Sequence, residues 1–115
     1  MPPLGDAEEL SRYQAVLDEA GRFAGCFDWK PIAADEAREF LGNWTPRGIE
    51  QLICEHRDEV KQKEEKREEH SSRFQFYYGL VVVIGGIKVF IETVFMPGSG
   101  RTPDRIRVVS IHPTT

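Results

Sequence analysis

The longest hydrophobic run in the chain, residues 74–96, predicts a β-hairpin. Gly85 and Gly86 divide the run in two, and β-branched and aromatic residues fill both halves. Two consecutive glycines suit a two-residue type I′ turn, because both central positions of that turn have positive φ. The run does not predict a membrane-spanning helix, since the two glycines, Lys88 and Glu92 interrupt it.

The predicted turn determines which residues of the hairpin share a face. A shift of one residue would exchange the two faces, so a strongly apolar face specifies the register. The first face is almost wholly apolar and has the pairs Ile84/Ile87, Val82/Val89, Leu80/Ile91, Tyr78/Thr93 and Phe76/Phe95. The second face is mixed and has the pairs Val83/Lys88, Val81/Phe90, Gly79/Glu92, Tyr77/Val94 and Gln75/Met96. We expect helices to cover the first face and leave open the apolar members of the second, Val81, Val83, Phe90 and Val94.

Apolar positions at helical spacing predict two helices near the N-terminus. The first begins near Asp6, where Glu9 follows at the spacing of a capping box, and ends near Ala24. The second is short and runs from Asp35 to Leu41. Apolar and polar residues alternate between the two helices, over residues 25–33, so a short extended piece can form there.

A third helix begins at Thr45-Pro46. Threonine is a good capping residue, and proline suits the first helical position because it has no N–H to leave unpaired. Charged residues follow from Lys61 to His70. We expect the helix to continue through them into solvent, with a disordered loop as the alternative.

A third strand is predicted over Asp104–Pro113, after a Gly-, Pro- and Ser-rich loop. It would pair antiparallel with Ile87–Met96. The apolar pair Val108-Val109 disturbs the alternation and indicates a β-bulge. We therefore expect one α+β domain over residues 1–115, with three N-terminal helices packed on a three-stranded antiparallel meander.

The composition is that of a soluble globular protein, with 40% hydrophobic and 30% charged residues in a chain of 115. The N-terminus has neither the basic nor the apolar region of a signal peptide, so we expect a cytoplasmic protein without membrane contact. Cys26 and Cys54 are then expected to be free thiols.

Charge is unevenly distributed along the chain, whose net charge is −4. Residues 1–72 carry 10 Lys and Arg against 17 Asp and Glu, whereas residues 73–115 carry 5 against 2. A dedicated nucleic-acid-binding protein is usually basic overall, so RNA is weakly supported as a partner. The excess positive charge on the predicted strands is compatible with a local site for an anion.

The second face carries the polar residues that could form a functional site. Glu92 could act as a general base, and Lys88 with Arg105 or Arg107 could contact phosphate or carboxylate. The alternative is a solvated face with cross-strand ion pairs, and a third interpretation is pairing with another chain through the apolar residues. The candidate binding residues are Tyr77, Lys88, Phe90, Glu92, Arg105 and Arg107. The candidate catalytic residues are Glu92, Arg107 and His112, which ends the last strand.

No metal or cofactor is expected. Cys54 and His56 are two positions apart on a predicted helix, so their side chains do not face the same way. No other pattern brings together the ligands that a zinc site needs.

The C-terminal two-thirds of the chain resembles the RelE/ParE-like small bacterial toxin superfamily and related uncharacterised domains. The resemblance covers roughly residues 45–113 and rests on TPRGIEQLI, GGIKVFIETVF and RIRVVSIHP. It implies a helix followed by an antiparallel meander. In ribonuclease members, basic and aromatic residues on the sheet and near the C-terminus contact and cut RNA. The matching positions here are Arg105, Arg107, His112 and Tyr77.

Three functions are compatible with these features. We expect a small bacterial binding or interaction protein that forms a homodimer, or binds a partner protein, through the second face. The first alternative is a toxin-like ribonuclease acting on RNA. The second is a small-molecule enzyme or binder with a pocket between the helices and the sheet. Whether the protein is an enzyme stays open.

Overall fold

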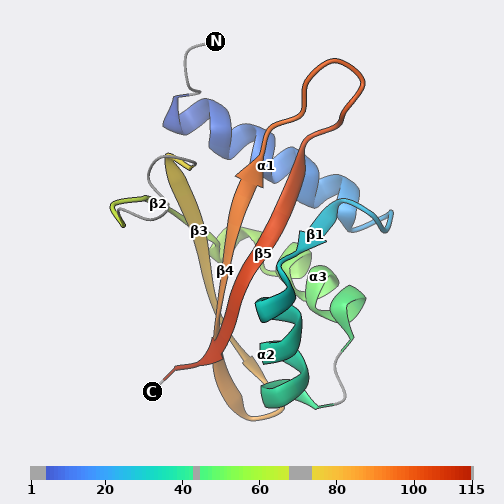
Figure 1. Cartoon of the computed structure of the whole chain (residues 1–115), viewed down its shortest axis with the longest axis vertical. Coiled ribbons are helices and arrows are strands. Elements are labelled where there is room, and N and C mark those ends of the chain that lie inside the picture. Colours follow the sequence, from blue (N-terminus) through green and yellow to red (C-terminus); the bar gives the residue numbers. More distant parts are fainter. Residues whose placement is uncertain (1–4, 43–44, 68–73, 115) are drawn as a thin grey trace.

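The predicted hairpin forms the centre of a five-stranded sheet in the computed structural model, which describes residues 5–42, 45–67 and 74–114. The helices are α1 (Asp6–Ala20), α2 (Pro31–Leu41) and α3 (Pro46–Glu55), with a 3-10 helix η1 (Arg57–Glu59) after α3. The strands are β1 (Phe27–Trp29), β2 (Lys61–Glu64), β3 (Phe76–Ile84), β4 (Ile87–Met96) and β5 (Arg105–Pro113). The strand order is β1-β5-β4-β3-β2, and only β1 runs parallel to its neighbour (Figure 1).

The α+β class with three helices is confirmed, but the predicted three-stranded sheet is wrong in detail. Strands β3, β4 and β5 do form an antiparallel meander in chain order. Two further strands, β1 and β2, extend this meander at its two edges. They contain only 3 and 4 residues, which is too few for a clear alternating pattern.

The register of the hairpin is confirmed from Ile84/Ile87 to Tyr78/Thr93. Gly85 and Gly86 have φ of 57° and 82°, as a turn with two left-handed positions requires. The first-face residues between Tyr78 and Phe95 are at most 6% exposed, except Ile87 beside the turn, which is 41% exposed.

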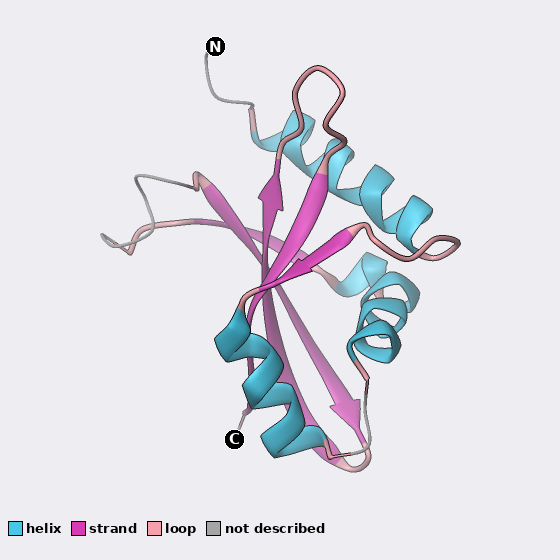
Figure 2. Cartoon of the chain, turned by 45° about the vertical axis from the view of Figure 1, so that its right-hand side comes forward, coloured by secondary structure: helices cyan, strands magenta, loops and turns pink. Residues whose placement is uncertain are grey.

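The helices cover the first face, as predicted. Figure 2 shows α1 and α3 together on one side of the twisted sheet. α1 buries Tyr13, Val16, Leu17 and Ala20, and α3 buries Ile49 and Ile53. α2 packs instead on β5, along the edge where β1 ends.

The predicted helix boundaries are partly correct. α1 begins at Asp6 but ends at Ala20, because Gly21 caps it before Ala24. α2 begins at Pro31 and not at Asp35, since proline also suits the first turn of this helix. α3 has the predicted cap, in which the Gly48 N–H donates to Thr45 Oγ1 at 3.1 Å.

The predicted continuation of the third helix is wrong. α3 ends at Glu55, and Lys61–Glu64 pairs with β3 as the edge strand β2. Lys, Gln, Glu and Arg all favour a helix, but pairing with the open backbone groups at the edge of β3 outweighs this preference, and two Glu pairs would repel at helical spacing. His70 lies outside the described residues.

The predicted bulge is confirmed in β5. Glu92 pairs with Ser110 and Thr93 pairs with Val108, so Val109 is the extra residue. A bulge sets two residues of one strand opposite one residue of the other and redirects side chains locally. It lies opposite Glu92, the predicted site residue.

Tyr13 connects α1 to the centre of the sheet. Its ring stacks on Tyr78 with 3.9 Å between centroids, and its hydroxyl lies 2.7 Å from Thr93 Oγ1. Thr93 Oγ1 donates to the Tyr78 carbonyl at 3.3 Å, so Tyr13 is the donor to Thr93.

We therefore expect Tyr13→Phe to lower the free energy of unfolding by about 1 kcal/mol, because it removes a buried hydrogen bond. Urea unfolding measures this loss. Tyr77→Phe on the second face is the control and should lose clearly less. Equal losses in the two variants would contradict the role of the Tyr13 hydroxyl.

Glu9 makes stability depend on pH. Its half-buried carboxylate accepts a hydrogen bond from the Tyr78 hydroxyl at 2.7 Å. Burial nevertheless raises the pKa of Glu9 above 4.5, against the opposing effects of Tyr78 and Arg12. The folded state thus favours the protonated acid, and the stability from this group is lost as pH rises through the raised pKa.

We expect Glu9→Gln to remove this pH-dependent loss of stability. Glutamine can still accept the hydrogen bond from the Tyr78 hydroxyl, but it carries no charge. The unfolding free energy of this variant should fall less than that of the wild type as pH rises from 4.5 towards neutrality. Chemical unfolding at a series of pH values measures this. Parallel profiles would refute the assignment.

Candidate functional site

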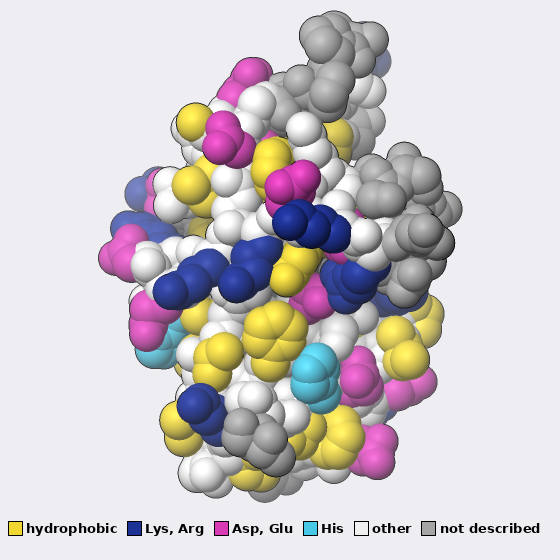
Figure 3. All heavy atoms as spheres, turned by 90° about the vertical axis from the view of Figure 1, so that its left-hand side faces the viewer, with side chains coloured by type: hydrophobic (Ala, Val, Ile, Leu, Met, Phe, Trp, Pro, Cys, Tyr) yellow, Lys and Arg dark blue, Asp and Glu magenta, His cyan; other side chains and the backbone are white. Residues whose placement is uncertain are grey.

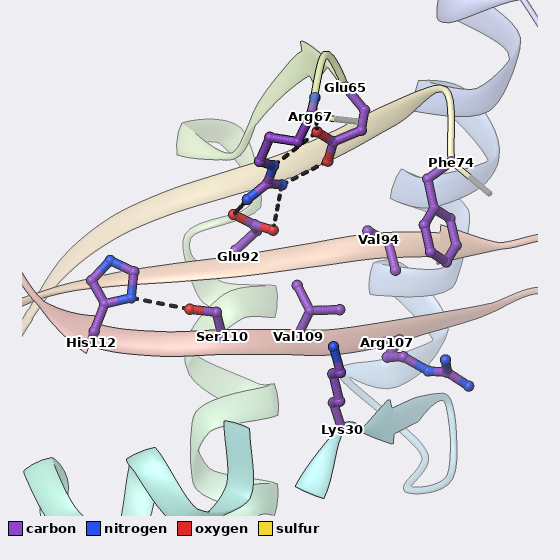
Figure 4. Close-up of a pocket in the computed structure, with 10 residues that line it drawn as sticks. All are labelled: Lys30, Glu65, Arg67, Phe74, Glu92, Val94, Arg107, Val109, Ser110 and His112. Atoms are coloured by element: carbon purple, nitrogen blue, oxygen red, sulfur yellow. Dashed lines mark hydrogen bonds and ion pairs between the residues drawn. The ribbon is translucent and has the colours of Figure 1, made fainter. Parts of the chain in front are cut away.

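A cavity of about 290 Å³ opens on the second face of the sheet. Its walls come from the β1–α2 junction, from the segment after β2, and from β4 and β5 (Figure 4). The lining residues are Lys30, Glu65, Arg67, Phe74, Glu92, Val94, Arg107, Val109, Ser110 and His112. This cavity lies on the face opposite α1 and α3, and not between helices and sheet, where the small-molecule hypothesis placed a pocket.

Arg67 joins two nearly buried carboxylates at one side of the cavity. Its Nη2 lies 2.6 Å from Glu65 Oε2 and 2.8 Å from Glu92 Oε2. Further bonds run from Nε to Glu65 Oε1 at 2.8 Å and from Nη1 to Glu92 Oε1 at 3.2 Å. These bonds raise the pKa of Arg67, which stays charged. Glu92 is therefore engaged by a cation, which does not suit the predicted role of general base.

The segment containing Arg67 also accounts for a correction on the second face. Val81 and Val83 are 45% and 68% exposed, as predicted, but Val94 is only 3% exposed. Val94 lines the cavity together with Phe74 and Arg67 (Figure 4). The prediction that nothing covers Val94 is therefore wrong, because Arg67 and Phe74 lie on this face beside it.

Lys30 and Arg107 form the opposite side of the cavity. The pairing of β1 with β5 places them there, because the Lys30 N–H donates to the Val108 carbonyl at 3.0 Å and Asp28 pairs with Arg107. Arg107 Nε and Nη2 each lie 2.8 Å from Asp28 Oδ2. The exposed ammonium group of Lys30 pairs with none of the described side chains.

His112 lies at the end of the cavity nearer the hairpin turn. Its Nδ1 is 3.0 Å from Ser110 Oγ, and its ring centroid is 5.4 Å from that of Phe90 (Figure 4). Phe90 in turn lies over Gly79, where an added Cβ would be 3.0 Å from Phe90 Cε2. Glycine at position 79 thus leaves room for the Phe90 ring.

The structure brings together some of the predicted site residues but not all. Glu92, Arg107 and His112 line the cavity, and the Tyr77 ring lies 5.0 Å from the Arg67 guanidinium. Two predicted binding residues lie elsewhere. Lys88 is exposed near the turn, opposite Val83. Arg105 donates to the Phe27 carbonyl at 3.1 Å, and its buried Nε has no partner among the described residues.

Sequence reasoning missed Lys30, Glu65, Arg67, Phe74 and Ser110. Lys30 reaches the site only through a parallel pairing between segments far apart in the chain. Glu65 and Arg67 belong to the charged segment that was predicted to be helical. Only one feature of the sequence pointed to Ser110 as a site residue, namely the bulge predicted beside it at Val108-Val109.

Neither thiol chemistry nor a metal site is supported in the described residues. Cys26 and Cys54 are free thiols, as predicted. Burial raises the pKa of Cys54 to about 11, which keeps its thiol protonated at neutral pH. Within residues 5–42, 45–67 and 74–114, no group of three or more His, Cys, Asp or Glu side chains could hold a metal ion.

No protein-family model, curated protein or solved structure matches the chain. The resemblance to RelE/ParE-like toxins therefore stays a prediction. In the described part of the chain, no helix is long and apolar enough to cross a membrane. The geometry of the second face is thus the basis for any functional proposal.

We expect Arg67→Ala to lower the free energy of unfolding by about 3 kcal/mol, because Glu92 would lose its cationic partner while nearly buried. Lys66→Ala removes an exposed cation from the same segment and should change stability by less than about 0.5 kcal/mol. Denaturant unfolding of both variants measures the difference. Losses of similar size would mean that the paired carboxylates do not depend on Arg67.

Proposed function

We propose that this protein is a binding protein that holds an anionic group of its ligand in the cavity on the second sheet face. The observation that carries the proposal is that Lys30, Arg107, Ser110 and His112 all line one hollow. The side chains of these residues can all donate hydrogen bonds, and two of them carry a fixed positive charge.

The charges around the cavity favour an anion. Both lining carboxylates, Glu65 and Glu92, are bonded to Arg67 and so are partly neutralised. Among the described residues, only Asp28 is a carboxylate bonded to Arg107, and it occupies two of the N–H groups and leaves others for a ligand. Lys30 adds a cation that pairs with none of the described side chains, so an entering carboxylate or phosphate would meet a positive site.

The arrangement supports binding better than catalysis. A general base must be able to accept a proton from the reacting group, and Glu92 is held by two hydrogen bonds from a guanidinium. The cavity volume of about 290 Å³ lies near the lower limit for small-molecule pockets. A small organic acid, or one phosphate group of a larger molecule, is of suitable size.

Lys30→Ala should weaken the binding of pyrophosphate at least tenfold, because one charge-assisted hydrogen bond contributes about 1.5–3 kcal/mol. Lys88→Ala is the matched control, since Lys88 is an exposed lysine of the same face outside the cavity. Calorimetric titration at low ionic strength gives both dissociation constants. Equal weakening by the two substitutions, or no binding by the wild type, would refute the proposal.

RNA cleavage is the second candidate, because Arg107 and His112 line the cavity together with Lys30. A cation could bind the scissile phosphate while the imidazole of His112 transfers a proton. If the protein cuts RNA, then His112→Ala and Arg107→Ala should each slow cleavage at least a hundredfold, the usual contribution of a positioned acid or base. Gel analysis of a labelled RNA measures this, and cleavage that survives both substitutions unchanged would exclude these residues as its source.

A further inference from the structure

A second hollow of about 570 Å³ lies on the same sheet face and shares no lining residue with the first cavity. We call it the β2 groove, because β2 and the preceding η1 form one wall. Its lining residues are Asp58, Glu59, Lys61, Lys63, Gly79, Val81 and Phe90. Figure 3 shows the side of the molecule on which β2 and β3 lie, with Lys and Arg side chains in a band above hydrophobic ones.

The floor of the β2 groove is apolar and open. Val81 pairs with Phe90 across β3 and β4, and the Phe90 ring lies over Gly79. Val83, the next second-face residue of β3, is 68% exposed, and Val81 is 45% exposed. Single exposed hydrophobic residues are common, but contiguous ones on a sheet face indicate an interaction surface.

The wall of the groove carries acidic side chains on η1 and basic side chains on β2. Asp58 and Glu59 come from η1, whereas Lys61 and Lys63 come from β2, opposite Gly79 and Tyr77. Glu59 contacts His56. No side chain among the described residues forms an ion pair with Asp58, Lys61 or Lys63. A partner whose surface carries only one sign of charge would be repelled either by the two acids or by the two lysines.

A second copy of the chain meets this requirement. In a two-fold interface, residue i of one protomer contacts residue j of its partner and the reverse contact also forms. Lys61 and Lys63 of each protomer would then face Asp58 and Glu59 of the other, with the apolar floors in contact between them.

We propose that the β2 groove is a homodimer interface, in which two copies of this chain dock about a two-fold axis through Val81, Val83 and Phe90. The lysines of one protomer and the acids of its partner determine the register. This inference is independent of the anion site, since neither hollow uses a residue of the other.

Sedimentation of the wild type over micromolar to millimolar concentrations should show a monomer–dimer equilibrium. Val83→Asp should raise the dissociation constant at least tenfold. Its thermal unfolding should match that of the wild type at concentrations where both are monomeric, because Val83 is 68% exposed in the single chain. Phe23→Asp is the matched control, since Phe23 is 62% exposed and lies in the loop after α1, away from the groove. A wild type that stays monomeric, or a Val83→Asp variant that dimerises normally, would overturn the proposal.

Charge reversal tests the two-fold arrangement itself. A variant with Lys61→Glu and Lys63→Glu should be monomeric, and so should a variant with Asp58→Lys and Glu59→Lys, because each places like charges across the interface. Mixing the two should produce a heterodimer, which native mass spectrometry separates by mass. A mixture with no heterodimer, from variants whose circular dichroism matches the wild type, would refute the docking arrangement.

Discussion

The two faces of the β3–β4 hairpin differ in polarity, and this difference determines where the helices pack. The Gly85-Gly86 turn sets a register in which most of the large apolar side chains of the hairpin point to the first face. That face must be buried, and α1 and α3 provide the cover through a core that includes Tyr13 and Ile53. Because these two helices pack on one face, the other face is left for polar residues and for the residues that follow β2.

The second face is divided into two parts with different physical character. Over β4 and β5, the residues that follow β2 bring Arg67 to Glu65 and Glu92, which would otherwise be buried charges. This arrangement shapes a polar cavity with Lys30 and Arg107 on its opposite side. Near β2 nothing described covers Val81 and Val83, and the surface there is apolar with charges at its margin. We propose that the first part binds an anion and the second part binds another copy of the chain.

The features that could be predicted from the sequence were those set by local patterns. The double glycine, the alternation in β3 and β4 and the Thr45-Pro46 cap each depend on neighbouring residues, and the structure has all three. The pairing of β1 with β5 and of β2 with β3 joins segments far apart in the chain, and short edge strands carry too little pattern to reveal it. For the same reason Glu92, Arg107 and His112 could be chosen as site candidates, whereas Lys30 and Arg67 could not.

We propose that ligands bind the second face and not the helical side. A two-dimensional NMR titration of isotope-labelled protein with pyrophosphate tests it most directly. The largest amide shift changes should fall on Lys30, Arg107, Ser110 and His112, while residues of α1 and α3 stay unchanged. Saturable changes centred on α1 and α3, or no saturable change anywhere, would contradict it.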